Sequence, residues 1–244
     1  MKAIIIGAGS GTRLGEYTRN SPKPLLKING KPLIQYQIDL FKKNNIDEIY
    51  VIVGSHSEQF NIDTKIIKDI EHIEHNIFGS LFVASDKINN DVLISYTDII
   101  YEEKILNQIL NSKSDIGIAV DLDWRKNYNN RTMHPTSEAE NVIIQDGKII
   151  EIRKNINYEN NIGEFLGVMK LTTMGSKVLF QMMEELKNYK GKFHYADSVK
   201  KAYLTDVIQE MIDRGNTVNP IIIKGKWCEI DTVQDLENTR EKFS

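Results

Sequence analysis

The sequence predicts an α/β fold built on a mostly parallel central sheet. Residues 3–6 form a short apolar run that breaks into a glycine-rich stretch, which is typical of a buried strand entering a ligand-binding loop. We expect an amphipathic helix over 31–45 and a second apolar strand over 49–53. A strand, a helix and a strand within about fifty residues form a right-handed unit with parallel strands. These observations indicate a Rossmann-like, three-layer α/β/α arrangement.

The remaining elements fit a single domain over 1–244. Further strands are predicted over 92–96 and 116–120, with a helix over 102–111 between them. A β-hairpin is predicted over 143–150, because two apolar runs there flank an Asp-Gly pair. No repeat or low-complexity segment divides the chain.

Composition limits the class of protein. The chain has 244 residues, a formal net charge of -3 and one cysteine, Cys228. A negative net charge gives no overall attraction for nucleic acid, so local basic groups must hold any anionic ligand. The sequence lacks a run of about 18 apolar residues, which argues against a membrane span. A lone cysteine cannot form an internal disulfide, which fits a cytoplasmic location.

The glycine-rich stretch predicts a loop that binds the phosphates of a nucleotide. Glycine has no Cβ atom, so backbone N–H groups can approach an anion closely. The residues predicted to bind the nucleotide here are Gly7, Ala8, Gly9, Ser10, Gly11 and Thr12. Arg13 and Lys23 lie just beyond the loop and supply fixed positive charge. Neither common glycine motif fits: Thr12 and Leu14 stand where a dinucleotide fingerprint needs glycine, and the Lys-Ser/Thr pair of a Walker A loop is missing.

The motif that remains, G-x-G-[ST]-R-L followed by Pro22-Lys23-Pro24-Leu25, resembles that of the nucleotidyltransferases that make nucleotide sugars and CDP-alcohols. The segments Asn76-x-x-x-Ser80-Leu81, Asp123-Trp124-Arg125 and 134–140 are similar to the phosphocholine and phosphonate cytidylyltransferase branch. The resemblance extends from Lys2 to about Leu236. It implies a nucleotidyltransferase fold with a nucleotide-binding half at 1–120 and an acceptor-binding half at 121–244, the latter with a hairpin and arm insertion at about 121–162.

The resemblance implies that Asn76 and Ser80 help to enclose the nucleotide. The residue pattern alone leaves a second explanation open. Asn76 stands at a predicted helix start, where it would cap the helix, and Ser80 would lie on the same helix face one turn later.

Carboxylates near two predicted strands indicate a Mg²⁺ site. Asp98 directly follows a buried strand and therefore lies at the edge of the cleft that the glycine loop faces, although aspartate there also serves as a turn former or helix cap. Glu229 and Asp231 are two residues apart on a predicted strand and so point to the same face. The resemblance implies that Asp231 shares Mg²⁺ with Asp98, and we assign Glu229 to substrate binding.

The acceptor side is predicted from charged residues in the second half of the chain. Residues 120–141 have the composition of a long loop or arm, from which Arg125 or Arg131 would touch the acceptor, or which would pair with a second subunit in a homodimer. Lys154 is a candidate for the acceptor phosphate, or a solvated lysine at a strand end. The resemblance implies that the segment 163–168 borders the acceptor pocket. Glu164 in it would suit a cationic amine, or is simply a charged residue of a loop. An aromatic cage for a quaternary ammonium is not evident in the sequence.

These residues together predict a Mg²⁺-dependent cytidylyltransferase. It would transfer CMP from CTP to a small phosphate monoester or phosphonate, such as phosphocholine, 2-aminoethylphosphonate or phosphoglutamine, and release pyrophosphate. We expect Arg13 to hold the leaving β- and γ-phosphates and Lys23 to bridge nucleotide and acceptor. Because the second pKa of a phosphate is about 6, the nucleophile needs no general base near neutral pH. A sugar-1-phosphate nucleotidyltransferase is the second interpretation, and a non-catalytic nucleotide-binding protein is the alternative from another class.

Overall fold

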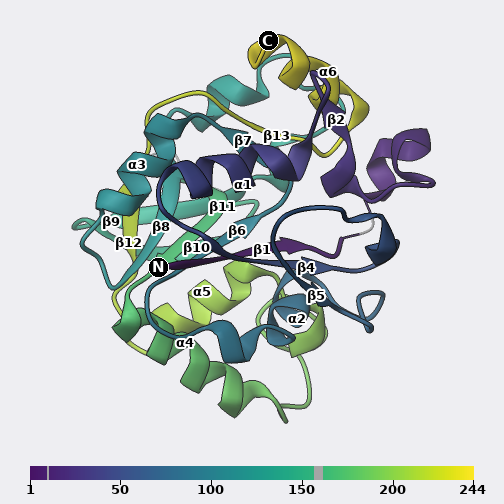
Figure 1. Ribbon diagram of the computed structural model, residues 1–244. Coiled ribbons are helices and arrows are strands. Elements are labelled where there is room, and N and C mark those ends of the chain that lie inside the picture. Colours follow the sequence, from purple (N-terminus) through teal and green to yellow (C-terminus); the bar gives the residue numbers. More distant parts are fainter. Residues whose placement is uncertain (10, 157–161) are drawn as a thin grey trace.

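The computed structural model describes residues 1–9, 11–156 and 162–244. In this part of the chain a large sheet forms the middle layer, with the strand order β10-β9-β11-β6-β1-β4-β5. Strand β8 also pairs with β11, and β12 pairs with β8. Helices cover both faces of the sheet (Figure 1). The predicted three-layer α/β/α architecture is therefore confirmed.

The first half of the chain builds the parallel part of the sheet. Its strands are β1 (Lys2–Gly7), β4 (Glu48–Val53), β5 (Lys65–Lys68) and β6 (Val92–Tyr96). Strand β1 pairs in parallel with β4 on one side and with β6 on the other, and β4 pairs in parallel with β5. Strands β1 and β6 are buried along their whole length. Helices cover both sides of them, which explains why their sequences are continuous apolar runs rather than alternating ones.

The second half adds strands around β11, which is antiparallel to each of its neighbours. The strands are β8 (Ile116–Asp121), β9 (Glu140–Gln145), β10 (Lys148–Lys154), β11 (Ile162–Leu171) and β12 (Asn219–Ile222). Strand β11 pairs with β8 on one edge and with β9 and β6 on the other. Only β10 and β11 in the described sheet run opposite to β1, so the sheet is mostly parallel.

The helices form the two outer layers. Helices α1 (Leu33–Lys43) and α3 (Glu103–Asn111) lie on one face, and α2 (Ile77–Phe82), α4 (Thr173–Leu186) and α5 (Leu204–Asp213) lie on the other (Figure 1). Helix α1 begins later than predicted because Lys31–Pro32 form a short strand, β3, paired with β2 (Lys27–Ile28). Among the described residues, every helix is too short or too polar to span a bilayer.

Two small features position the site described below. Asp146 and Gly147 have φ angles of 50° and 72°, so the predicted hairpin turn between β9 and β10 is confirmed. Strand β7 (Ile99–Tyr101) pairs antiparallel with β13 (Trp227–Glu229), just before α6 (Val233–Lys242). This second pairing brings a segment near the C-terminal end of the chain beside the carboxyl end of β6.

Candidate active site

The glycine-rich loop leaves the end of β1 and leads into the 3-10 helix Thr12–Thr18. Gly11 has a φ of 61°, and a Cβ atom there would lie 3.0 Å from the Cβ atom of Lys23, so both backbone conformation and space require glycine. The loop borders a cavity, here called the glycine-loop cavity. Its lining includes these predicted residues: Ala8, Gly9, Gly11, Thr12, Asn76 and Ser80. Gly7 lies beneath the loop, close to Ile52 and Pro24, and Ser10 lies outside the described residues.

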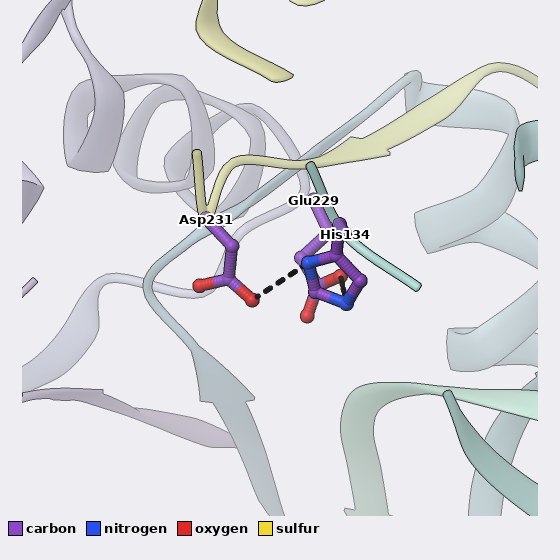
Figure 2. Close-up of side chains that lie close together, drawn as sticks. All are labelled: His134, Glu229 and Asp231. Atoms are coloured by element: carbon purple, nitrogen blue, oxygen red, sulfur yellow. Dashed lines mark ion pairs between the residues drawn. The ribbon is translucent and has the colours of Figure 1, made fainter. Parts of the chain in front are cut away.

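Three ionisable side chains lie close together, as Figure 2 shows: His134, Glu229 and Asp231. Of these, Asp231 also lines the glycine-loop cavity. The prediction that Glu229 and Asp231 share one strand is wrong, because β13 ends at Glu229. They still face one site, where His134 Nδ1 lies 3.5 Å from Asp231 Oδ2 and His134 Nε2 lies 3.7 Å from Glu229 Oε2. Burial, together with the charge of Arg131, lowers the pKa of His134 to about 4, so its imidazole is neutral at neutral pH. Burial and the charge of Asp231 raise the pKa of Glu229.

Arg131 supplies the positive charge of this cluster. Its Nη2 atom donates to Glu229 Oε2 at 3.0 Å and to His134 Nδ1 at 3.2 Å, and its Nε atom donates to Asp235 Oδ1 at 2.5 Å. Asp235 in turn accepts from the backbone N–H of Asp231 at 3.1 Å and caps α6. Arg131 therefore connects the 120–141 segment to the segment that carries Asp231.

Residues 120–141 include the predicted long loop, between β8 and β9, but side chains within it anchor the loop to the body of the protein. Trp124 and Tyr128 are buried in an apolar cluster beside β9 and β11, and His134 is buried as well. Arg131 is engaged in the ion pairs described above rather than facing an acceptor. Arg125 is exposed and its guanidinium lies 4.7 Å from the ring centroid of Trp124. The spacing of Trp124 and Tyr128, four residues apart, was the sequence signal for their burial. It was difficult to recognise because most residues around them are polar. Pairing with a second subunit stays a prediction.

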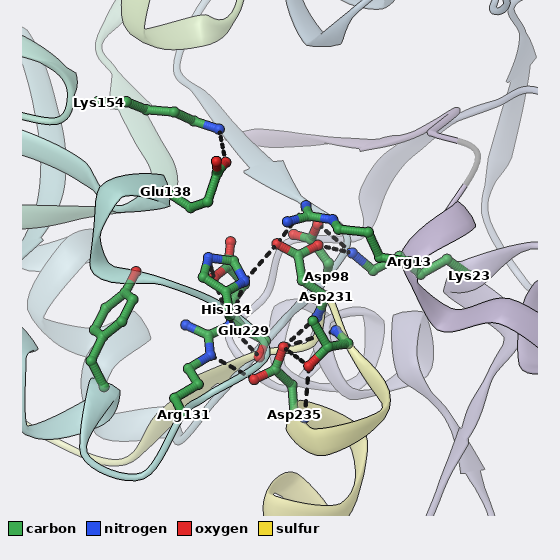
Figure 3. A network of polar contacts seen from close by, with 12 residues as sticks. Arg13, Lys23, Asp98, Arg131, His134, Glu138, Lys154, Glu229, Asp231 and Asp235 are labelled. Atoms are coloured by element: carbon green, nitrogen blue, oxygen red, sulfur yellow. Dashed lines mark hydrogen bonds and ion pairs between the residues drawn. The ribbon is translucent and has the colours of Figure 1, made fainter.

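Lys23 lies between the two predicted metal-binding carboxylates (Figure 3). Its Nζ atom is 2.8 Å from Asp98 Oδ2 and 2.7 Å from Asp231 Oδ1, and the residue is only 7% exposed. Burial alone would lower the pKa of Lys23, but the two carboxylates raise it above its ordinary value. Arg13 approaches from the more open side, with Nη2 2.9 Å from Asp231 Oδ2. Burial alone would raise the pKa of Asp231, and Lys23 and Arg13 instead hold it well below its usual range.

Asp98 and Asp231 have the chemistry that Mg²⁺ requires. Carboxylate oxygens are among the ligands that this hard cation prefers. Asp98 Oδ1 is buried and has no hydrogen-bond partner among the described residues. The carboxylate of Asp98 thus has an unsatisfied oxygen that a bound cation would satisfy, so the two aspartates fit the predicted metal.

A second cavity adjoins the first and contains an unusual number of acidic groups. This glutamate cavity, as we call it, is lined by Glu138, Glu140, Glu164 and Glu229. Burial raises the pKa of Glu140 to about 7 and that of Glu164 to about 8. Lys154 also lines the cavity, and its Nζ atom is 2.9 Å from Glu138 Oε2. Lys154 thus stands at the end of β10 with its side chain partly exposed and paired with Glu138.

Glu164 lies on β11 rather than in the predicted loop. The glycines on both sides of it suggested a loop, but Gly163 packs against Val120, and Gly167, with a φ of 75°, packs against the ring of Tyr96. Glu164 is 3% exposed, and Tyr128 Oη donates to its Oε1 atom at 2.6 Å. Its Oε2 atom has no hydrogen-bond partner among the described residues. This carboxyl group is therefore buried in the cavity wall with one oxygen unsatisfied.

Aromatic side chains complete the glutamate cavity. The rings come from four separate parts of the chain: Tyr96, Phe165, Tyr203 and Trp227. Sequence reasoning missed this grouping because no two of these residues are close together in the chain. Aromatic faces and carboxylates are the groups that surround organic cations in proteins.

Comparisons with known proteins agree on one family. A sequence model described as the MobA-like NTP transferase domain matches residues 3–188. The CTP:phosphoglutamine cytidylyltransferase of Campylobacter jejuni is 31% identical over 260 residues, which cover 99% of this chain and 100% of that protein. The choline-phosphate cytidylyltransferase of Streptococcus pneumoniae is 35% identical over 117 residues, which cover 46% of this chain and 51% of that protein.

The fold agrees with this assignment. The solved structure of CTP:phosphocholine cytidylyltransferase from Streptococcus pneumoniae matches with a TM-score of 0.76 and 23% sequence identity. The match covers 100% of this chain and 99% of that one. At this level of identity the structural likeness establishes the fold.

Proposed function

This chain belongs to the MobA-like NTP transferase family of nucleotidyltransferases, and we propose that it is a Mg²⁺-dependent cytidylyltransferase. It transfers CMP from CTP to a small phosphate monoester or phosphonate and releases pyrophosphate. The observation that carries the proposal is that Arg13, Asp98 and Asp231 line both cavities. A nucleotide in the glycine-loop cavity and an acceptor in the glutamate cavity would therefore meet at these three residues.

The chemistry requires two anions to approach each other. An oxygen of the acceptor attacks the α-phosphorus of CTP, and the bond from that phosphorus to the pyrophosphate oxygen breaks. Asp98 and Asp231 would hold Mg²⁺, which when bound would supply charge neutralisation and orientation of triphosphate oxygens. Lys23 offsets charge where nucleotide and acceptor meet, and Arg13 pairs with the departing pyrophosphate. Because the acceptor is largely dianionic near neutral pH, the neutral His134 is not needed as a base.

The acceptor carries a nitrogen group that is cationic or donates hydrogen bonds. The four glutamates and the aromatic rings of the glutamate cavity support this, since they suit a cationic or donor end of the molecule. The two relatives named above act on phosphoglutamine and choline phosphate. We therefore rank phosphorylated amides, phosphocholine and 2-aminoethylphosphonate above sugar 1-phosphates.

Pyrophosphate release tests the proposal directly. The purified protein is assayed with each of the four NTPs against phosphocholine, 2-aminoethylphosphonate, phosphoglutamine and glucose 1-phosphate, with Mg²⁺ or with excess chelator. We expect release with CTP and one of the nitrogen-containing acceptors, and loss of activity with chelator. A sugar 1-phosphate with UTP or dTTP as the best pair would contradict the cytidylyltransferase assignment, and activity that survives chelation would contradict the metal.

A further inference from the structure

One wall of the glycine-loop cavity consists of polar side chains whose other hydrogen-bond partners lie in the protein. Asn76 precedes α2 and Ser80 lies one turn into it, so both face the same side of this short helix. Both side chains line the cavity. The prediction that the Asn76 side chain caps α2 is wrong, because that side chain makes no capping hydrogen bond. Its contacts, and those of Ser80, determine what the wall offers to a ligand.

Asp69 fixes the direction of the Ser80 hydroxyl. Asp69 follows β5, is 2% exposed, and continues the pairing with β4 through a 2.8 Å hydrogen bond from its backbone N–H to Val53 O. Its Oδ2 atom accepts from Ser80 Oγ at 2.7 Å and lies 2.9 Å from His75 Nδ1. A carboxylate can only accept, and a hydroxyl has one proton to donate. The proton of Ser80 is therefore directed at Asp69, and only oxygen lone pairs face the cavity.

The backbone at Lys201 fixes Asn76 in the same sense. Asn76 Nδ2 donates to Lys201 O at 2.6 Å, so the amide nitrogen faces this carbonyl and Oδ1 is left as an acceptor. The preceding carbonyl, Lys200 O, accepts from the backbone N–H of Asn76 at 2.9 Å, which holds the 200–201 backbone against Asn76. Gly79 allows this close approach, since a Cβ atom there would lie 2.2 Å from Lys200 O. Ser80 Oγ and Asn76 Oδ1 are thus both held as acceptors on residues that line this cavity.

We propose that Asp69 is a positioning residue that selects the nucleobase, by holding Ser80 as one of two acceptors on this wall. The inference rests on the proposed function, because it concerns the CTP site of that enzyme. The exocyclic amine of cytosine donates two hydrogens and matches two acceptors. The 4-oxo group of uracil would place its lone pairs against theirs, and a site built around one hydrogen-bond polarity rejects the opposite one strongly.

The test compares CTP with UTP, which differ at this edge of the base. We measure kcat/KM for both nucleotides with one acceptor in the wild type, Ser80→Ala, Asp69→Asn and Ser176→Ala. Ser176 is the matched control, because it is an equally buried helical serine on α4 that lines neither cavity. We expect the CTP to UTP ratio to fall by about tenfold or more in Ser80→Ala, the worth of one hydrogen bond, and to stay constant in Ser176→Ala.

The Asp69→Asn variant distinguishes two roles of Asp69: orienting the Ser80 hydroxyl, or only stabilising the fold. Its amide N–H can donate to Ser80, which frees the serine proton to point into the cavity. We expect kcat/KM for UTP to rise above the wild-type value while that for CTP falls, an exchange that simple loss of structure would not produce. Should Asp69→Asn fail to fold, Ser80→Ala still decides whether the acceptor that Asp69 holds selects the base, with its thermal unfolding midpoint compared with that of the wild type.

The possible failures are distinguishable. If the wild type prefers CTP and Ser80→Ala keeps the wild-type CTP to UTP ratio, the inference is overturned and the proposed function stands. If the wild type prefers UTP or dTTP, the cytidylyltransferase assignment itself fails, and the inference fails with it.

Discussion

The glycine-loop cavity and the glutamate cavity meet at Asp98 and Asp231 but are built from different parts of the fold. The first lies at the carboxyl ends of the parallel strands β1 and β6, where α/β sheets place their ligands. Its lining combines the glycine loop with polar and charged side chains that include Lys23, Asn76 and Ser80. The second is lined by residues of the antiparallel strands β9 to β11 and the 120–141 segment, and its buried carboxyl groups have raised pKa values.

The two cavities therefore differ in how their charges are held: those of the glycine-loop cavity are paired, and a carboxyl group of the glutamate cavity titrates near neutral pH. The glycine-loop cavity has its charges paired in advance, since Lys23 already contacts both aspartates. The glutamate cavity holds a carboxyl group, Glu164, with an unsatisfied oxygen and a pKa near the physiological range. Substitutions on the glycine-loop side should therefore lower turnover, and substitutions on the glutamate side should change the affinity for the acceptor and its dependence on pH.

Lys23→Met should have the largest effect. It removes the charge shared by nucleotide and acceptor and leaves Asp98 and Asp231 facing each other, so we expect kcat to fall by about 10³-fold and the thermal unfolding midpoint to fall as well. Lys27→Met, at an exposed lysine of β2, is the control and should match the wild type. A Lys23→Met enzyme that keeps a tenth of the wild-type kcat would show that the site does not depend on this charge.

Arg13→Ala should lower kcat by about 10²- to 10³-fold, because it removes one donor to the departing pyrophosphate. In contrast to Lys23, the side chain of Arg13 is 52% exposed, so the thermal unfolding midpoint should stay close to that of the wild type. Arg19→Ala, at an exposed arginine nearby, serves as the comparison. Near-normal turnover in Arg13→Ala would show that residues other than Arg13 bind the departing pyrophosphate.

Glu164→Gln should act on the acceptor alone. Below about pH 8 the carboxyl group of Glu164 is largely protonated and neutral, and above it the group carries a negative charge that attracts a cation. The KM for a cationic acceptor should therefore fall as pH rises from 7 to 9 in the wild type, and this dependence should flatten in the variant. At pH 9 we expect KM to be about tenfold higher in Glu164→Gln, with the KM for CTP unchanged.

Phosphocholine is the preferred probe for this experiment because its ammonium group does not titrate. Glu237→Gln, at an exposed residue of α6, controls for the change in net charge. If the KM for phosphocholine changes with pH in the same way in the wild type and in Glu164→Gln, Glu164 does not face the cationic group.

Lys154→Met should have the smallest effect. Lys154 is already paired with Glu138, and an ion pair of this kind contributes little, so the KM for the acceptor should rise by about threefold or less. Lys148→Met, at an exposed position on the same strand, should not change it. A loss of tenfold or more would mean that Lys154 leaves Glu138 to bind the acceptor phosphate.

Much of the fold could be predicted from local patterns. The buried parallel strands are continuous apolar runs, and the Asp-Gly pair matches its hairpin turn. Two elements were misjudged for opposite reasons. Glycines made β11 resemble a loop around Glu164, whereas polar residues in the 120–141 loop masked the aromatic side chains that anchor it. In both places packing against neighbouring strands, which a local pattern does not contain, decided the outcome.

The sequence by itself determined the family and the positions of the glycine loop, Arg13, Lys23, Asp98 and Asp231, because each stands in a contiguous motif or beside a strand end. Only the tertiary structure placed Lys23 between the two aspartates, one 75 and the other 208 positions away, and directed Ser80 toward Asp69. It also gathered the aromatic rings of the glutamate cavity from four segments. These contacts depend on how strands pair across the sheet, and such pairing joins residues whose separation in the chain leaves no local signal.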